Sequence, residues 1–258
     1  MNRYDIALDL ACNYNAELKE QYLEQAEKTI KSNEVVILFT TDIHTETGKL
    51  HHVTERKTEL LKESKNVLLL DSGDINEKTK DVTKQMNGYY DFVVGGNHDS
   101  LCNGQNFLKR VDEADFQYIG YDLVKDGVPV FDPYVIKDYG CFKIGIIGQG
   151  RLNVSSGKWN GMKAKRDNVL LQKYVDEIRN DVDCIILLYH AGLDECRKML
   201  KTVSGIDVVL GGHTHKIVNE VLMDKNGKYV HFAQAGVRLN CYGEMTLNDE
   251  ILIELKKL

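Results

Sequence analysis

The sequence predicts an α/β protein with βαβ units in its first half and more β-strand in its second half. Five short apolar runs, at residues 35–39, 67–70, 92–94, 184–188 and 206–210, have the length and composition of buried strands. Segments with helical spacing separate several of these runs. The last part of the chain is mostly extended and contains the turn-forming run Asn248-Asp249-Glu250.

Residues 1–33 are expected to form a helical extension ahead of the main domain. Five of their apolar side chains share one face at helical spacing: Leu18, Tyr22, Leu23, Ala26 and Ile30. The run Lys31-Ser32-Asn33 provides a stop signal. Such a face packs either on the outside of the sheet or against a second copy of the chain, and the sequence leaves both open.

Residues 34–258 are expected to form one domain, because no flexible linker interrupts them. Both prolines, Pro129 and Pro133, lie in one connector. Helices are expected at residues 53–63, in a segment ending near Gly88, and at residues 106–113 and 168–180. Further strands are expected at residues 134–136, 142–147, 230–234, 243–247 and 251–255, the first two joined by a turn at 138–140.

The composition is that of an ordinary globular protein. The chain has 258 residues, of which 43% are hydrophobic and 28% are charged, and its net charge is −6. An acidic balance disfavours long nucleic acids and membrane surfaces as partners. No apolar run approaches the ~18 residues of a membrane span, no secretory signal is evident, and no Cys-x-x-Cys pair occurs. These features predict a cytoplasmic protein with reduced thiols.

Polar clusters follow the apolar runs at the point where each predicted strand ends. They are Asp42-Ile43-His44, Asp71-Ser72-Gly73-Asp74, Gly96-Asn97-His98-Asp99, His190 and Gly212-His213-Thr214-His215. In an open α/β sheet, ligands bind outside the carboxyl ends of the strands. We therefore expect residues that are far apart in the sequence to meet at one edge.

The residue types in these clusters indicate a metal centre. Carboxylates, imidazoles and an amide oxygen suit divalent ions such as Mn, Zn or Fe. A carboxylate can bridge two ions, as in two-metal phosphoryl-transfer sites. Among the expected ligands only Asp42 and Asp74 carry charge, so two divalent ions would leave a surplus of positive charge. Such a centre favours an anionic substrate, and phosphate oxygens suit hard cations.

Each cluster taken alone has a simpler explanation. Ser72-Gly73-Asp74 has the composition of a turn, and Asn97 or Asp99 could cap a helix. His190 could be a core histidine with a backbone hydrogen bond, and the glycines before His213 could form a turn. The occurrence of all the clusters on successive strand ends is what favours a metal site.

These clusters resemble the motif set of the calcineurin-like metallophosphoesterases. The matching residues are Asp42-x-His44, Gly73-Asp74, Gly96-Asn97-His98-Asp99, His190 and Gly212-His213-x-His215. The resemblance is closer to the catalytic domain of bacterial 5′-nucleotidases and 2′,3′-cyclic-nucleotide phosphodiesterases. Residues 67–74, 133–136, 143–148 and 234–236 support that subgroup, and the resemblance spans residues 34–258.

The resemblance implies a four-layer α/β/β/α sandwich of two facing mixed sheets. It implies that one metal ion is held by Asp42, His44, Asp74 and His215. It implies that a second ion is held by Asp74, Asn97, His190 and His213, with Asp74 bridging. Asn97 and His98 would contact the substrate: Asn97 would orient the phosphoryl group, and His98 would be the general acid near the leaving-group oxygen.

The sequence departs from the family pattern in two ways. The larger 5′-nucleotidases have a C-terminal domain that grips the nucleoside, and the sequence ends too soon after His215 to hold one, so the resemblance does not extend to base recognition. Many relatives read Asn-His-Glu-Phe-Asp, where the last Asp supports the histidine. Here the corresponding residue is Leu101, which has no carboxylate. Asp99 is adjacent to His98 but could point elsewhere, so the partner of His98 stays unassigned.

Other residues have both a functional and a structural interpretation, and the structural one is preferred for each. His51 and His52, in the loop expected after the first cluster, could line a substrate pocket or lie in solvent. Arg151 could bind a phosphate or be a surface charge. Trp159 could stack on a base or fill a hydrophobic gap. His231 is most simply a strand residue.

The expected function is that of a dinuclear-metal-dependent phosphoester hydrolase acting on small phosphorylated substrates, above all nucleotides. A binding scaffold of the same fold is one alternative. A phosphatase of non-nucleotide substrates, or a nuclease, is another, although the acidic charge disfavours long nucleic acids. The sequence leaves the native metals and the oligomeric state open.

Overall fold

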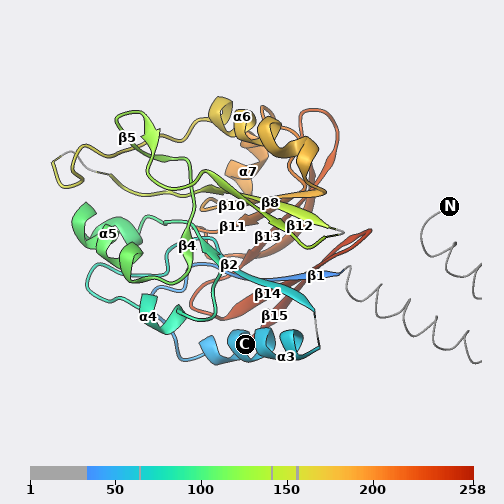
Figure 1. Ribbon diagram of the computed structural model, residues 1–258, viewed down its shortest axis with the longest axis horizontal. Coiled ribbons are helices and arrows are strands. Elements are labelled where there is room, and N and C mark those ends of the chain that lie inside the picture. Colours follow the sequence, from blue (N-terminus) through green and yellow to red (C-terminus); the bar gives the residue numbers. More distant parts are fainter. Residues whose placement is uncertain (1–33, 64, 141, 155–156) are drawn as a thin grey trace, which may run out of the picture.

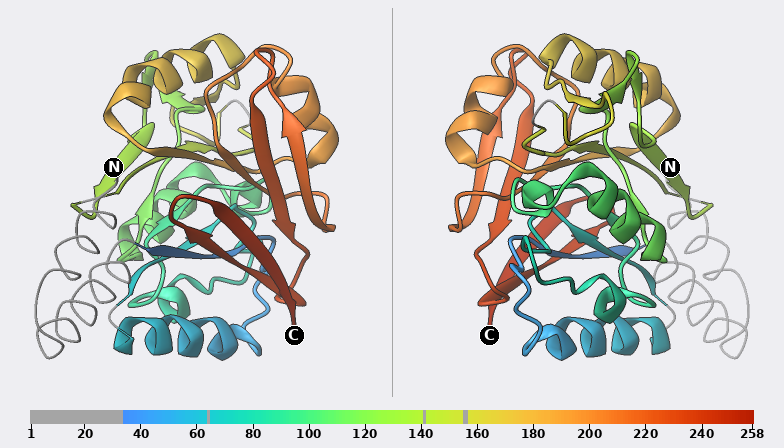
Figure 2. Two further views of the ribbon diagram at one scale, coloured as in Figure 1. Left: turned by 90° about the vertical axis from the view of Figure 1, so that its right-hand side faces the viewer. Right: turned by 90° about the vertical axis from the view of Figure 1, so that its left-hand side faces the viewer.

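Figure 1 shows the computed structural model of the chain, which describes residues 34–63, 65–140, 142–154 and 157–258. The described residues form two six-stranded sheets packed face to face, with helices on both outer sides (Figures 1 and 2). This arrangement confirms the α/β/β/α sandwich that the resemblance implied. The helical extension expected at residues 1–33 lies outside the described residues, so the domain boundary at residue 34 stays a prediction.

The first sheet contains parallel and antiparallel pairs. In spatial order its strands are β15 (Ile251–Lys257), β14 (Cys241–Leu247), β1 (Val35–Thr40), β2 (Asn66–Asp71), β3 (Phe92–Val93) and β4 (Gln117–Tyr118). Strands β1 to β4 are parallel neighbours, whereas β14 pairs antiparallel with both β1 and β15. The carboxyl ends of β1, β2 and β3 therefore lie at one edge.

The second sheet is also mixed. In spatial order its strands are β12 (Ile217–Met223), β13 (Tyr229–Ala235), β11 (Val208–Gly211), β10 (Cys184–Tyr189), β8 (Lys143–Gln149) and β7 (Tyr134–Asp138). The four central strands are parallel, and the two edge strands run antiparallel to them. A small third sheet contains β6 (Val128–Pro129), β5 (Leu123–Lys125) and β9 (Lys163–Ala164).

Helices cover the outer face of each large sheet (Figure 2). Those on the first sheet are α3 (Leu50–Lys62), α4 (Thr83–Met86) and α5 (Gly104–Glu113). Those on the second sheet are α6 (Asn168–Ile178) and α7 (Leu193–Met199). Two 3₁₀ turns, η1 (Asp99–Leu101) and η2 (Arg179–Asp181), complete the described helical segments. Among the described helices, none combines the length and apolar character needed to cross a bilayer.

Burial on both faces explains why the central strands are continuous apolar runs. On β1, Val36 and Leu38 pack toward α3 and α5, while Ile37 and Phe39 pack into the core between the two sheets. On β10, Ile185 and its alternate neighbours pack instead against α6 and α7. The core between the sheets fixes the position of one sheet relative to the other.

One expectation about secondary structure was wrong. The structure places His51 and His52 on α3 and not in a loop, because the helix already begins at Leu50, where Leu50 and Val53 both turn into the core. In addition, α7 and β12 were not expected from the sequence. Helix α7 buries only Cys196 and Met199, and β12 is an exposed edge strand.

Trp159 fills a hydrophobic gap, as the structural interpretation expected. Its side chain is 2% exposed and lies beside Phe107 of α5, with ring centroids 5.5 Å apart. Gly104, the first residue of α5, packs so closely that an added Cβ would lie 3.0 Å from the Trp159 backbone. The indole therefore belongs to the core outside the first sheet.

Replacing Trp159 with alanine should lower the free energy of unfolding by about 3–5 kcal/mol, because it leaves a cavity in this core. Val169→Ala is the matched control, since Val169 is 80% exposed on α6 and surface substitutions usually change stability by less than about 0.5 kcal/mol. Urea denaturation of both variants measures the difference. Equal stability of the two variants would contradict a structural role for Trp159.

Candidate metal centre

The seven candidate ligands converge from five strands of the two sheets. Backbone hydrogen bonds join the loops that carry them: the N–H of Asp42 donates to Gly73 O at 2.9 Å, and that of His44 to Asp74 O at 2.9 Å. From the second sheet, the N–H of His213 donates to the carboxylate of Asp42 at 3.0 Å. The strand ends of both sheets therefore form one site.

A first group of donor atoms comes from Asp42, His44 and His215. The Nε2 atoms of the two imidazoles lie 3.1 Å apart. The Oδ1 atom of Asp42 lies 3.5 Å from Nε2 of His215 and 3.9 Å from Nε2 of His44. One donor atom from each residue therefore faces a common point, a geometry that could hold a metal ion.

A second group comes from Asp74, Asn97, His190 and His213. The amide Oδ1 of Asn97 lies 2.8 Å from Nδ1 of His213 and 3.3 Å from Nε2 of His190. The Oδ2 atom of Asp74 lies 3.2 Å from Nε2 of His190, and also 3.9 Å from Nε2 of His44 in the first group. Asp74 therefore lies between the two groups.

The buried carboxylate of Asp74 fits a cation. Its Oδ2 atom is buried and accepts no hydrogen bond of acceptable geometry, although Nε2 of His190 is near. A buried acceptor left without a hydrogen bond costs about 1–3 kcal/mol, and the charge attraction of His190 at 3.2 Å offsets only part of that cost. A divalent ion at this oxygen would remove that cost, and the surrounding nitrogen and oxygen donors suit Mn, Zn or Fe.

Five of the seven candidate ligands have a left-handed backbone. Their φ angles are 52° for Asp42, 48° for His44, 60° for Asp74, 72° for His213 and 60° for His215. For residues other than glycine, this conformation costs of the order of 1–3 kcal/mol and concentrates at functional sites. The loops therefore adopt a strained backbone that directs these side chains into the site.

Two glycines make room for these side chains. Gly73 has φ +98°, and a Cβ there would lie 2.7 Å from Nδ1 of His190. A Cβ on Gly96 would lie 2.1 Å from Oδ1 of Asp74. A side chain at either position would push a candidate ligand out of place.

Asp99 supports the loops and not the imidazole of His98. Its Oδ2 accepts the N–H groups of Asp74 at 2.9 Å and Gly96 at 2.8 Å, and its Oδ1 accepts that of Asn76 at 2.8 Å. Burial and repulsion by Asp74 raise the pKa of Asp99 to about 7, against the effect of these hydrogen bonds. The expectation that Asp99 could point away from His98 is confirmed.

Glu77, which lies beside two of the candidate imidazoles, was not among the residues expected from the sequence. Both carboxylate oxygens of Glu77 lie 3.1 Å from Nδ1 of His98, and Oε1 lies 2.8 Å from Nδ1 of His44. Burial raises the pKa of Glu77, but the hydrogen bonds with His98 and His44 outweigh it and hold the pKa below its usual value. Only its position three residues after Asp74 could have drawn attention to it.

The two imidazoles of the second group have pKa values shifted in opposite directions. Burial alone would lower the pKa of His190, but attraction to Asp74 and Asp42 outweighs it and raises the pKa to about 9. Burial lowers the pKa of His213 to about 4, and the nearby Arg151 guanidinium adds to this effect. In the metal-free protein at neutral pH, these shifts favour the cationic form of His190 and the neutral form of His213.

The remaining residues singled out in the sequence lie outside these two groups. Arg151 forms an ion pair with Glu195, at 2.8 Å between Nη1 and Oε2. His51 and His52 are exposed on α3, and His231 is a partly buried residue of β13. None of these four residues contributes a donor atom to the metal-binding groups of the described residues.

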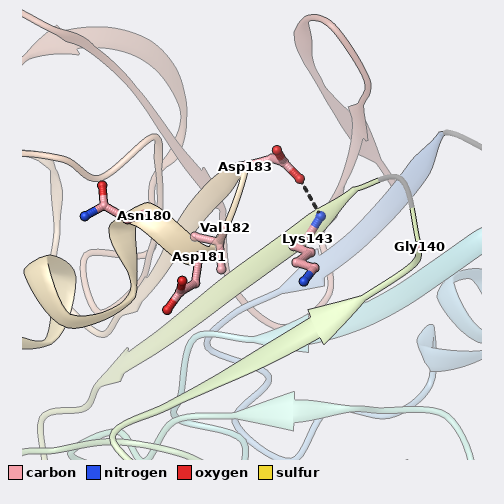
Figure 3. A pocket seen from close by; sticks show the side chains of 6 residues that line it. All are labelled: Gly140, Lys143, Asn180, Asp181, Val182 and Asp183. Carbon is pink, nitrogen blue, oxygen red and sulfur yellow. Dashed lines mark hydrogen bonds between the residues drawn. The ribbon is translucent and has the colours of Figure 1, made fainter.

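A surface hollow at the other end of the second sheet is unrelated to this centre. Figure 3 shows the residues that line it: Gly140, Lys143, Asn180, Asp181, Val182 and Asp183. The Asp183 carboxylate accepts the backbone N–H of Lys143 at 2.7 Å. Since β8 begins at Lys143 and β10 begins next to Asp183, the hollow lies at the edge opposite to the candidate ligands.

Comparison of the sequence with known proteins points to the same family as the residues of the site. The model of the calcineurin-like phosphoesterase family matches residues 35–217. The chain is 30% identical over 220 residues to the snake venom 5′-nucleotidase of Crotalus adamanteus, covering 71% of this chain and 37% of that protein. The chain thus spans less than half the length of this relative.

Two solved structures share the fold. The 5′-nucleotidase precursor from Thermus thermophilus superposes with a TM-score of 0.71 at 21% identity, covering 87% of this chain and 54% of that one. The NAD nucleotidase of Haemophilus influenzae gives a TM-score of 0.70 at 19% identity, covering 87% of this chain and 55% of that one.

Loading the metal-free protein with Mn²⁺ at pH 7 should release about one proton from His190, because a ligand imidazole must be neutral. The proton count comes from calorimetric titration in buffers of different ionisation enthalpy. The variant His190→Gln should release about one proton fewer. His213→Gln is the matched control and should leave the proton count unchanged, since the pKa of His213 is already about 4. The same proton count in all three proteins would contradict the charge assignment.

Proposed function

Because the chain belongs to the calcineurin-like phosphoesterase family, we propose that it is a metal-dependent phosphoester hydrolase. The observation that carries the proposal is the buried Oδ2 of Asp74, which lacks a hydrogen bond and lies near imidazole nitrogens of both donor groups. An interaction scaffold would have no need for this unsatisfied carboxylate, or for the strained loops around it.

We assign two divalent ions to the centre. Asp42, His44, Asp74 and His215 would hold one ion, and Asp74, Asn97, His190 and His213 would hold the other. When bound, such ions activate water as a nucleophile and neutralise the oxygens of a phosphoryl group. Mn, Zn and Fe all suit this mixture of donors.

His98 is assigned as the general acid. Its side chain is 36% exposed, whereas those of His44 and His190 are buried, so His98 can meet a substrate. Its backbone N–H donates to Oδ1 of Asp74 at 2.6 Å, which ties its position to the shared carboxylate. A positioned imidazole there can give a proton to the leaving-group oxygen, while the amide of Asn97 orients the phosphoryl group.

The proposed substrates are small phosphoesters, with nucleotides first among them. Support comes from similar proteins that are 5′-nucleotidases, among them those of Crotalus adamanteus and Rattus norvegicus. Phosphorylated substrates that are not nucleotides remain the alternative. A cytoplasmic location, and the lack of membrane or long nucleic-acid partners, stay predictions from the sequence.

The protein loaded with Mn²⁺ should release nitrophenol from nitrophenyl phosphate or bis-nitrophenyl phosphate, and phosphate from a nucleotide library. Asp74→Asn should lose metal and turnover together, because one carboxylate serves both donor groups. Elemental analysis reports the metal content of each protein. Wild-type protein with both ions bound and no turnover on any phosphoester would end the proposal.

The variants Asn97→Ala and His98→Ala should affect different properties of the enzyme. Loss of a general acid lowers kcat by about 10²–10⁴-fold, and His98→Ala should do so with its metal content intact. Asn97→Ala should weaken metal retention or raise KM for the phosphoester. Steady-state kinetics with elemental analysis separates the two variants, and equal metal loss in both would contradict this division of roles.

A further inference from the structure

We propose that Glu77 is the positioning residue for His98, and that its one carboxylate also orients His44. This inference rests on the proposed function, because it concerns the acid of that reaction. Both Glu77 oxygens lie 3.1 Å from Nδ1 of His98, and Oε1 lies 2.8 Å from Nδ1 of His44. These distances are those of hydrogen bonds from N–H to oxygen.

The contacts fix where the ring protons lie. An ionised carboxylate can only accept hydrogen bonds, so both Nδ1 atoms must carry a proton. In a neutral ring the other nitrogen, Nε2, then keeps its lone pair. For His44, that Nε2 atom lies 3.1 Å from Nε2 of His215 and faces the first donor group. For His98, Nε2 is the nitrogen left to exchange a proton with a substrate.

The two imidazoles are also packed against each other. Their ring centroids lie 4.4 Å apart and the planes meet at 89°, so one ring presents its edge to the face of the other. Glu77 therefore holds a compact pair of rings through one carboxylate. A displacement of Glu77 would release both rings together.

The main chain at Glu77 is itself anchored. Nη2 of the buried Arg110 donates to Glu77 O at 2.9 Å, and the Glu77 N–H donates to Lys80 O at 3.1 Å. The preceding residue is fixed through the bond from Asn76 N–H to Asp99. These bonds fix the backbone position from which the Glu77 carboxylate reaches His98.

Among the described residues, Glu77 is the carboxylate that pairs with His98. Asp99 is engaged by three backbone N–H groups. Leu101, where many relatives have an Asp, is apolar and exposed. The support for His98 thus comes from the loop after β2 and not from its own loop.

Nitrogen NMR of the metal-free protein, labelled with ¹⁵N-histidine, tests the proposal without using activity. Wild-type His98 should show a protonated Nδ1, and Glu77→Ala should shift the ring toward the Nε2-protonated form. The variant Glu77→Gln, which keeps an acceptor oxygen, should retain part of the wild-type pattern. An unprotonated Nδ1 of His98 in the wild-type protein, or an unchanged pattern in Glu77→Ala, would overturn the proposal.

Kinetics of the Mn²⁺-loaded protein adds the functional consequence. Glu77→Ala should lower kcat by about 10–100-fold, the range for partners of metal-site residues. The loss should be larger for an alkyl phosphate than for nitrophenyl phosphate, whose leaving group needs little protonation. In the double variant with His98→Ala, the loss should be smaller than the product of the two single losses, because the part of the Glu77→Ala effect that acts through His98 is already removed. Glu254→Gln, at an exposed residue of β15, is the matched control and should keep wild-type kcat.

The outcomes separate this inference from the proposed function. A wild-type protein that turns over no phosphoester would end the proposed function, while the NMR result would still decide the role of Glu77. If Glu77→Ala lowers kcat equally for the alkyl phosphate and for nitrophenyl phosphate, and also loses metal, then Glu77 acts through His44 alone. That result would overturn the assignment to His98.

Discussion

The carboxylate of Asp99 is the constraint on which the site depends. It accepts three backbone N–H groups, two from the loop after β2 and one from the loop after β3. A buried carboxylate is costly unless it is hydrogen-bonded, and its pKa near 7 reflects that burial. By joining the two loops, Asp99 fixes Asp74 relative to His98, whose N–H donates to the Asp74 side chain. The shared carboxylate and the proposed acid are therefore positioned by the same hydrogen bonds.

The site is completed only when the two sheets pack together. Asp42 and Asp74 follow strands of the first sheet, whereas His190 follows β10 of the second. The Ser72 hydroxyl donates to Leu210 O at 2.9 Å, and Nδ1 of His190 lies 2.6 Å from Ser72 O, so polar contacts continue the apolar core between the sheets. These contacts across the sheets oppose the backbone strain of the ligand loops. A change that loosens the core between the sheets should therefore also disturb the geometry of the centre.

Much of this arrangement could be predicted because the buried strands are apolar on both faces and the candidate ligands follow them directly. The positions of β1, β2, β10 and β11 confirm the apolar runs to within a residue or two. Glu77 could not be predicted, since it lies in a polar loop whose path is set by Arg110 and Asp99. The edge strand β12 was missed because Asn219-Glu220 interrupts its apolar residues, so that they form neither a continuous run nor a clean alternation, and residues 1–33 stay untested.

A single carboxylate shared by two imidazoles couples metal retention to acid orientation. If His44 holds a metal ion as proposed, its ring proton would stay on Nδ1, which is the atom that lies 2.8 Å from Glu77 Oε1. Glu77 held in this way keeps its oxygens directed at Nδ1 of His98. Linkage makes the effect reciprocal, so a His98 ring locked on Glu77 also favours the His44 tautomer that binds metal. The acid and the first donor group should therefore become ordered together.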